Sequence, residues 1–426
     1  MINNSFFSIL DRILYAGLKF LVIVLLGHWL GSSGQGTFSL YLVVWAWVGT
    51  FSSLGLVISN NYYGAKGTSP KKISLLLGNT IVFGFCSGML AVVVIWILAI
   101  NSNVFRGLTP NKLHILLIGV LLYSLYMPLL GLLVGLEEFK LKMISSLVIF
   151  AFFLLLIFWQ RQTAVLSSSK LGLDWLLATG LGMSIWCWKL LKRSDFQIGF
   201  DKDLLRKQIV YGIKTYRYSI TNSTLARVDV LIISNILGTD ATGVYSVALY
   251  FAEVLMYFPA AFTTVLLASV GSGRQIQKEF YRNISTFFLM AILVSALIIP
   301  ILVPIFFPPE YLISVVLAEI MLLGVYWLGM GSIGSYHILG NEKFSVPFYA
   351  SLVAVIVEIS LAFILVLPFG LIGVAIASMV AYINFGVIVF YSIARDYQCS
   401  IKDMLFPNNP MKLMKDLIAY YGNKNH

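Results

Sequence analysis

Charged residues are scarce in this chain. Asp, Glu, Lys and Arg make up 11% of its 426 residues, and 59% are hydrophobic, whereas an ordinary soluble domain carries about 25% charged residues. The mean hydropathy of +0.90 agrees with this balance. The composition therefore excludes a soluble globular protein and predicts a chain that lies mostly in lipid.

Residues that build catalytic and metal sites are equally few. Cys86, Cys187 and Cys399 are too few and too scattered for a disulfide framework, and we expect them to be small buried apolar residues. The sequence has no glycine-rich phosphate loop, no metal-ligand spacing, and no serine or cysteine nucleophile with a nearby base. We therefore expect no enzyme activity, no catalytic residue, no metal site and no bound cofactor.

What the chain does contain is a series of apolar segments, each close to the roughly 20 residues that a helix needs to cross a bilayer. Six lie in the first half, near residues 10–30, 38–60, 73–99, 113–135, 143–159 and 172–190. Six more lie near 215–237, 241–268, 284–307, 312–338, 346–368 and 370–394. The first has no basic leader and no cleavage pattern, so we expect it to be retained as a span. The predicted fold is an all-α polytopic membrane protein with twelve transmembrane helices.

Lysine and arginine are concentrated in every second connection between these segments. If the N-terminus is inside, the outer connections hold only four basic residues, Arg106, Lys112, Arg161 and Lys170. The positive-inside rule then predicts that both termini are cytoplasmic. This bias accounts for the formal net charge of +11. The basic residues are also attracted to the headgroups of membrane lipids, so the charge does not require a nucleic-acid partner.

The two halves of the chain share a repeated motif. Leu30–Leu40 reads LGSSGQGTFSL, and Leu237–Val247 reads LGTDATGVYSV. Gly135–Phe139 (GLEEF) and Gly340–Phe344 (GNEKF) repeat at nearly the same offset. Because six spans per half is an even number, internal duplication predicts two bundles related by a pseudo-two-fold axis along the membrane normal.

This symmetry sets the expected domain boundaries. Residues 1–190 form the N-terminal six-helix bundle, and residues 215–394 form the C-terminal one. Between them, residues 191–214 form a basic amphipathic linker that we expect to be cytoplasmic and to dock on the inner membrane surface. Residues 395–426 form a cytoplasmic tail.

Glycines of the repeated motif are expected to specify the fold. Gly31 and Gly238 stand where a span must end, and glycine closes a helix most easily in the left-handed conformation. Gly36 and Gly243 follow at the start of the next helix, where a missing side chain permits close approach of two backbones.

Two cations are predicted near the middle of the membrane, Lys19 in the first span and Arg227 in the seventh. An ionisable group at this depth costs about 2.5–3.5 kcal/mol unless it is paired or hydrated. On helical spacing, Arg12, Tyr15 and Lys19 share one face of the first span. Ser219, Ser223, Arg227 and Ser234 share a face if the seventh span is a regular helix. Either a water-filled cavity or pairing with intramembrane acids explains these residues.

Four acidic residues lie within the second-half spans: Asp229, Glu253, Glu319 and Glu358. They are candidates either for coupling to protons or sodium or for hydrogen bonds between helices. On a regular helix Asp229 points away from Arg227, two residues earlier, and needs another partner. Tyr15, Trp45 and Trp47 are candidates to line a path and stack on sugar rings.

The chain resembles the Wzx-type O-antigen flippases of the multidrug/oligosaccharidyl-lipid/polysaccharide (MOP) superfamily. The resemblance rests on the motif LGSSGQGTFSLYL and its repeat LGTDATGVYSVAL, on Arg227-Val-Asp229 before the repeat, on GLEEFK and LGNEKF, and on GLIGVAIASMVAY in the last span. It covers essentially all twelve spans and implies a MATE-like pair of bundles. It also implies translocation of an undecaprenyl-diphosphate-linked oligosaccharide from the inner to the outer leaflet of the bacterial plasma membrane.

The implied cargo fits the cations predicted from the sequence. A diphosphate that crosses a low-dielectric region needs positive charge, which Lys19 and Arg227, with Arg12 and Tyr15 on the same path, are placed to give. The resemblance does not distinguish between an O-antigen repeat unit, which belongs to the lipopolysaccharide pathway, and a repeat unit of a capsule or exopolysaccharide. A polysaccharide polymerase and chain-length machinery are further partners to consider.

Two other function classes remain open. A cation-coupled multidrug exporter of the same superfamily shares the duplication but is expected to carry a coupling acid in the first bundle, where Asp11, at the inner edge, is the only acid of the first span. A membrane polysaccharide polymerase predicts a large outer loop, and the outer connections here are about a dozen residues at most.

Overall fold

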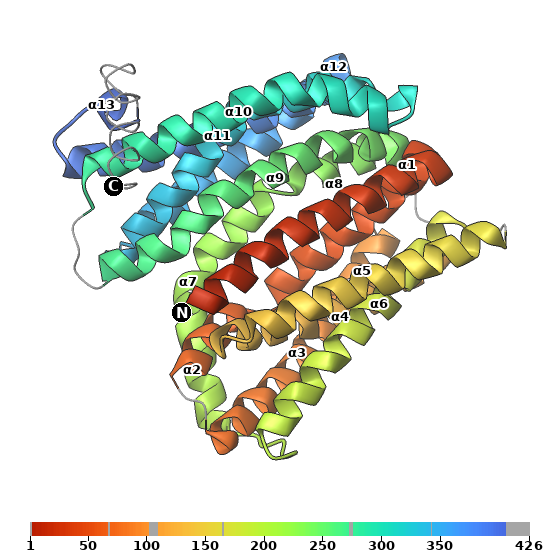
Figure 1. The fold of residues 1–426 in the computed structure, drawn as a ribbon, viewed down its shortest axis with the longest axis vertical. Helices are drawn as coiled ribbons and strands as arrows, with labels where there is room; N and C mark the ends of the chain where they lie inside the picture. The colour runs from red at the N-terminus through yellow and green to blue at the C-terminus, as the bar shows by residue number, and fades with distance from the viewer. Residues whose placement is uncertain are drawn as a thin grey trace, which may run out of the picture.

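The computed structural model describes residues 2–66, 69–101, 110–163, 166–271, 276–341 and 343–405. Within these ranges the regular structure is entirely helical (Figure 1). The start of α1 and the short helix α13 lie toward the left of Figure 1, and the turn within α1 lies at the opposite end.

The first half of the chain forms one lobe. Its helices are α1 (Ile2–Ser52), α2 (Leu56–Ala65), α3 (Pro70–Asn101), α4 (Pro110–Gly135), α5 (Phe139–Gln162) and α6 (Ser168–Arg193). α1 is a hairpin of two helical arms, because the backbone leaves the helical region at Gly31. α2 continues the second arm beyond a break at residues 53–55.

The second half forms the other lobe. Its elements are α7 (Lys202–Leu225), α8 (Val228–Ile236), α9 (Gly238–Gly271), α10 (Lys278–Phe306), the 3-10 turn η2 (Pro309–Tyr311), α11 (Ile313–Gly340), α12 (Ser345–Asp396) and α13 (Ile401–Leu405). α12 is again two arms, joined by a non-helical turn at Gly370. A single apolar core fills most of this lobe, and two smaller cores fill the first.

Eight helices of the described chain are long and apolar enough to cross a membrane. Two of these, α1 and α12, each supply two passes through their arms. α6 and the α7–α8 pair supply the remaining two, although their polar residues keep them out of that group of eight. The helices therefore match the twelve predicted spans in order, and the predicted fold class is confirmed.

The seventh span is broken at Arg227, so the prediction of a regular helix over 215–237 is wrong. Arg227 has φ −145° and ψ −11°, and it separates α7 from α8. The hydroxyls of Thr221 and Thr224 bond to carbonyls one turn back, and Asp229 accepts the amide of Val230 at 2.8 Å. Such local side-chain bonds compete with the helical ladder and favour its end at this point.

The linker region packs on the first lobe. α7 begins at Lys202 and continues without interruption past residue 214 into the span. The buried Gln208 donates to Asn60 at 2.7 Å and accepts from Asn79 at 2.9 Å. Val210 and Ile213 are exposed on α7, so docking of this side on the membrane surface stays a prediction, as do the domain boundaries.

The repeated motifs meet each other, a contact that the sequence did not predict, although close backbone approach at their glycines was expected. Gly31 and Gly238 have φ values of +63° and +88°. A Cβ added at Gly36 would lie 1.8 Å from the carbonyl oxygen of Thr239, and one at Gly243 would lie 1.9 Å from that of Ser32. The two lobes are therefore in backbone contact at the turn of α1, where α1 and α9 lie side by side (Figure 1).

Candidate functional site

A cavity lies between the lobes. Its first chamber, of about 530 Å³, is walled by α1, α4, α5, α6, α8 and α9. A second chamber, of about 440 Å³, extends toward α11 and α12. Both chambers share a group of side chains from the two lobes, which includes Tyr15, Lys19, Arg227, Glu253 and Tyr257.

Three of the shared residues form an ion cluster that joins the two lobes. Glu253 on α9 pairs with Lys19 through one carboxylate oxygen and with Arg227 through the other. Their side chains are 21%, 23% and 30% exposed, respectively, so they are accessible from the cavity. The ring of Phe20, next to Lys19, stacks on Tyr250 of α9 at 5.6 Å.

The sequence left open whether Lys19 and Arg227 line a cavity or pair with intramembrane acids, and the structure shows both. Lys19 and Arg227 do pair with an intramembrane acid, and they also line the cavity. The break at Arg227 contributes to this arrangement, because it frees the side chain from the face that a continuous helix would impose. The proposed stripe of Ser219, Ser223, Arg227 and Ser234 therefore does not exist as one helical face.

Arg12 and Tyr15 lie in the first chamber, where the sequence placed them. Within the described part of the chain Arg12 forms no ion pair, and its buried Nη1 has no hydrogen-bond partner. The neighbouring Asp11 pairs with Lys142 of α5 at 3.0 Å. Since Glu253 and Asp11 are the acids among the lining residues, the first chamber carries an excess of positive charge.

Two of the four predicted acids lie deeper in the second lobe. Asp229, in the first turn of α8, is fully buried and accepts a hydrogen bond from Tyr245 at 2.7 Å. Glu358 on α12 is also fully buried, interacts electrostatically with Asp229, and has no hydrogen bond of standard geometry at either carboxylate oxygen. Glu319 on α11 is exposed and lines neither chamber. Glu253 therefore lines both chambers, whereas Asp229 and Glu358 are buried behind it and line neither. Asp229 still interacts electrostatically with Arg227 and Glu253.

The repeated motifs close one end of the cavity, which we call the closed end (residues 32–36 and 239–246). Ser32 and Ser33 bond to Asp240 and Thr239 at 3.3 and 3.2 Å. Behind them, the buried Gln35 donates to Ser246 at 3.2 Å. η2 adds two contacts, from Tyr311 to Gln35 and from the Ser32 amide to Glu310, both at 2.8 Å.

The aromatic residues that line the path differ from those predicted. Tyr15 lies in the cavity, but Trp45 is buried and donates to the carbonyl of Leu116, and Trp47 donates to Thr224. Phe150 and Trp175 border the first chamber from the buried core of the first lobe. Aromatic residues are frequent throughout the predicted spans, so no pattern in the sequence distinguishes these two.

No known family profile matches the chain. It is 25% identical over 242 residues to the amylovoran biosynthesis protein AmsL of Erwinia amylovora; the match covers 54% of this chain and 60% of that protein. The chain thus aligns with less than two thirds of this curated relative.

Solved structures match over nearly the whole chain. The lipid II flippase MurJ in an inward closed conformation superposes with a TM-score of 0.71 at 16% identity, over 95% of this chain and 89% of MurJ. An inward-facing MATE transporter of the MOP superfamily gives 0.64 at 14% identity, over 91% and 98%. The eukaryotic MATE transporter AtDTX14 gives 0.62 at 15% identity, over 94% and 95%.

These matches define the class of the protein. It is a multi-pass membrane protein with the two-lobed fold that MurJ shares with the MATE transporters. The AmsL match adds a similarity in sequence to a protein of amylovoran biosynthesis. Both findings agree with the resemblance to the polysaccharide flippases of the MOP superfamily.

Proposed function

We propose that this protein is a flippase for an undecaprenyl-diphosphate-linked oligosaccharide in the bacterial inner membrane. The observation that carries the proposal is the cluster of Lys19, Arg227 and Glu253, which brings two cations from different lobes to one point of a central cavity. The similarity to AmsL, named for amylovoran biosynthesis, supports a polysaccharide repeat unit as the cargo.

The ion cluster explains how the cavity recognises a diphosphate. The carboxylate of Glu253 occupies the position between Lys19 and Arg227 that a diphosphate would take. A diphosphate offers more oxygen acceptors and more negative charge than one carboxylate, so it displaces Glu253 from the cations. Arg12 lies about two helical turns before Lys19 on the same face of α1. Without an ion pair among the described residues, it provides an earlier contact for the anion.

The orientation follows the positive-inside rule. With both termini cytoplasmic, the closed end faces outward and Arg12 lies toward the cytoplasm. Cargo then enters from the inner leaflet, and rocking of the lobes separates Gly36 from Thr239 and opens the outer side. A polysaccharide polymerase and chain-length machinery would receive the cargo there.

Coupling is assigned to the second lobe. Two buried carboxyl groups, Asp229 and Glu358, interact with each other, and a proton or a sodium ion would offset the cost of burying their charge. The break between α7 and α8 lies beside them, so their neutralisation can change how Arg227 is held.

Reconstituted protein tests this function. Proteoliposomes would receive a panel of fluorescent polyprenyl-diphosphate-linked sugars, and a membrane-impermeant quencher would report transfer between leaflets. We expect transfer of at least one probe, and we expect Lys19→Gln with Arg227→Gln to abolish it. Export of cationic drugs, with no transfer of any probe, would instead identify a multidrug exporter. An imposed proton or sodium gradient that leaves the rate unchanged would refute coupling through Asp229 and Glu358.

A further inference from the structure

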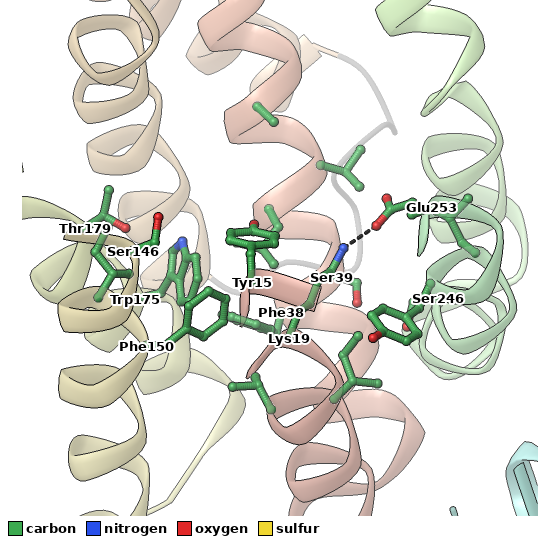
Figure 2. Close-up of a pocket in the computed structure, with 18 of the residues that line it drawn as sticks. Tyr15, Lys19, Phe38, Ser39, Ser146, Phe150, Trp175, Thr179, Ser246 and Glu253 are labelled. Atoms are coloured by element: carbon green, nitrogen blue, oxygen red, sulfur yellow. Dashed lines mark hydrogen bonds and ion pairs between the residues drawn. The ribbon is translucent and has the colours of Figure 1, made fainter. Parts of the chain in front are cut away.

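Aromatic rings border the first chamber on the side of the first lobe, where an exposed tyrosine, Tyr15, packs on the buried rings of that lobe's core. Tyr15 meets the edge of Phe150, with ring centroids 5.1 Å apart and planes at 81°. Phe150 in turn meets Trp175 at 5.5 Å and 72°. In Figure 2 these three rings gather on one side of α1, while Lys19 points the other way toward Glu253.

Hydroxyl groups lie in the same chamber. Ser146 and Thr179 lie beside the aromatic rings, and Ser39 lies near Lys19 (Figure 2). Tyr15 and Tyr126 contribute phenolic hydroxyls. In the described part of the chain, the side chain of Ser39 and the hydroxyls of Tyr15 and Tyr126 make no hydrogen bond. They are therefore free to bond to a ligand.

Aromatic rings and unpaired hydroxyl groups are not needed to bind a diphosphate, so they indicate a second part of the ligand. A diphosphate is recognised by cations, and an isoprenoid chain by aliphatic surface. Sugar rings present an apolar C–H face together with a rim of hydroxyl groups, which suits aromatic rings combined with unpaired hydroxyls. A volume of about 530 Å³ lies within the range of specific ligand pockets, about 300–1,000 Å³.

We propose that the exposed ring of Tyr15, supported from behind by Phe150, forms a saccharide subsite together with the hydroxyl of Ser39. The inference rests on the proposed function, because it takes the phosphate position as given. Tyr15 precedes Lys19 by four residues, so one helical turn of about 5.4–6 Å separates them along α1. A diphosphate held by Lys19 therefore places the first sugar against the ring of Tyr15. The subsite binds the saccharide, and the ion cluster binds the phosphate.

Paired soluble probes separate the two sites. The protein would be purified in lipid nanodiscs, and the Kd would be measured for farnesyl diphosphate and for its esters with galactose, N-acetylglucosamine and glucuronic acid. We expect at least one ester to bind about tenfold more tightly than farnesyl diphosphate, which corresponds to about 1.4 kcal/mol. The readout is the ratio of the two Kd values.

The test variant is Tyr15→Leu combined with Ser39→Ala. We expect its ratio to fall below about twofold, since the variant removes the accessible ring of Tyr15 and two hydroxyls but keeps Lys19 and Arg227. The matched control is Tyr336→Leu, because Tyr336 lines the second chamber and not the first. The control should keep the wild-type ratio.

The outcomes distinguish the subsite from the flippase function. If farnesyl diphosphate binds but no ester binds more tightly, the subsite is refuted and the phosphate site stands. A tenfold ratio that persists in the Tyr15→Leu, Ser39→Ala protein also refutes it. If neither type of probe binds the wild-type protein, both the phosphate site and the subsite are wrong.

Discussion

Glu253 and Lys19 form an ion pair although 234 positions separate them in the chain. They lie on α9 and α1, the helices through which the two lobes meet. The same carboxylate also pairs with Arg227. One acid thus holds cations from both lobes, and whatever displaces it changes the contact between the lobes as well as the charge of the cavity.

Neutralising the cations should weaken binding of the phosphate. We expect Lys19→Gln and Arg227→Gln each to raise the Kd for farnesyl diphosphate about 10- to 100-fold, because each removes a charge-assisted contact of about 1.5–3 kcal/mol. Lys207→Gln is the matched control, since Lys207 is exposed on α7. Equal affinities in all three proteins and the wild type would contradict the assignment.

Neutralising the acid should have the opposite effect on binding. In Glu253→Gln, the cations lose their internal partner, so we expect farnesyl diphosphate to bind about tenfold more tightly. Release should then slow, and transfer in proteoliposomes should fall although affinity rises. Weaker binding by the Gln variant would show that Glu253 positions the cations and does not compete with the cargo.

A single methyl group should prevent closure of the closed end. Alanine at Gly36 or Gly243 would place Cβ less than 2 Å from a carbonyl oxygen of the opposite lobe. We expect Gly36→Ala to increase the distance between spin labels at residues 33 and 239, measured by pulsed electron resonance. Gly17→Ala, on the same helix with nothing within 4 Å of the added Cβ, should leave the distance distribution unchanged. An unchanged distribution in Gly36→Ala would mean that the backbone adjusts at no cost.

The buried amide network should fasten α7 to the first lobe. Gln208→Leu leaves polar groups of Asn60 and Asn79 without their partner, and a buried unpaired group costs about 1–3 kcal/mol. We expect a lower unfolding temperature in detergent, measured by the fluorescence of a thiol-reactive dye. The adjacent exposed Lys207→Gln should unfold at the wild-type temperature, and equal values for both variants would exclude a structural role for the network.

The fold could be predicted largely because it depends on patterns that a sequence displays. Apolar length marked the spans, and the repeated motif located the turns at Gly31 and Gly238. Close backbone approach at Gly36 and Gly243 was also expected from the repeat, but that each glycine contacts the backbone of the opposite lobe was not.

The site could be predicted only in part. Lys19 and Arg227 were found because a charge in a membrane helix is conspicuous. Their common partner could not be predicted, because four acids lie within the second-half spans. Only the packing of α9 on α1 brings Glu253, and not another acid, to both cations. The helix break at Arg227 was not predicted, because the hydroxyl-to-carbonyl bonds of Thr221 and Thr224 beside it also occur inside unbroken helices, as at Thr286.

The contact between Gly36 and Gly243 has an evolutionary consequence. Each copy of the duplicated unit uses its own glycine to make room for the backbone of the other copy. After such a duplication, most positions can diverge independently because they face lipid or their own lobe. These two positions remain a shared constraint, so a homologue with a side chain at one of them would need a compensating change in the other half of its chain.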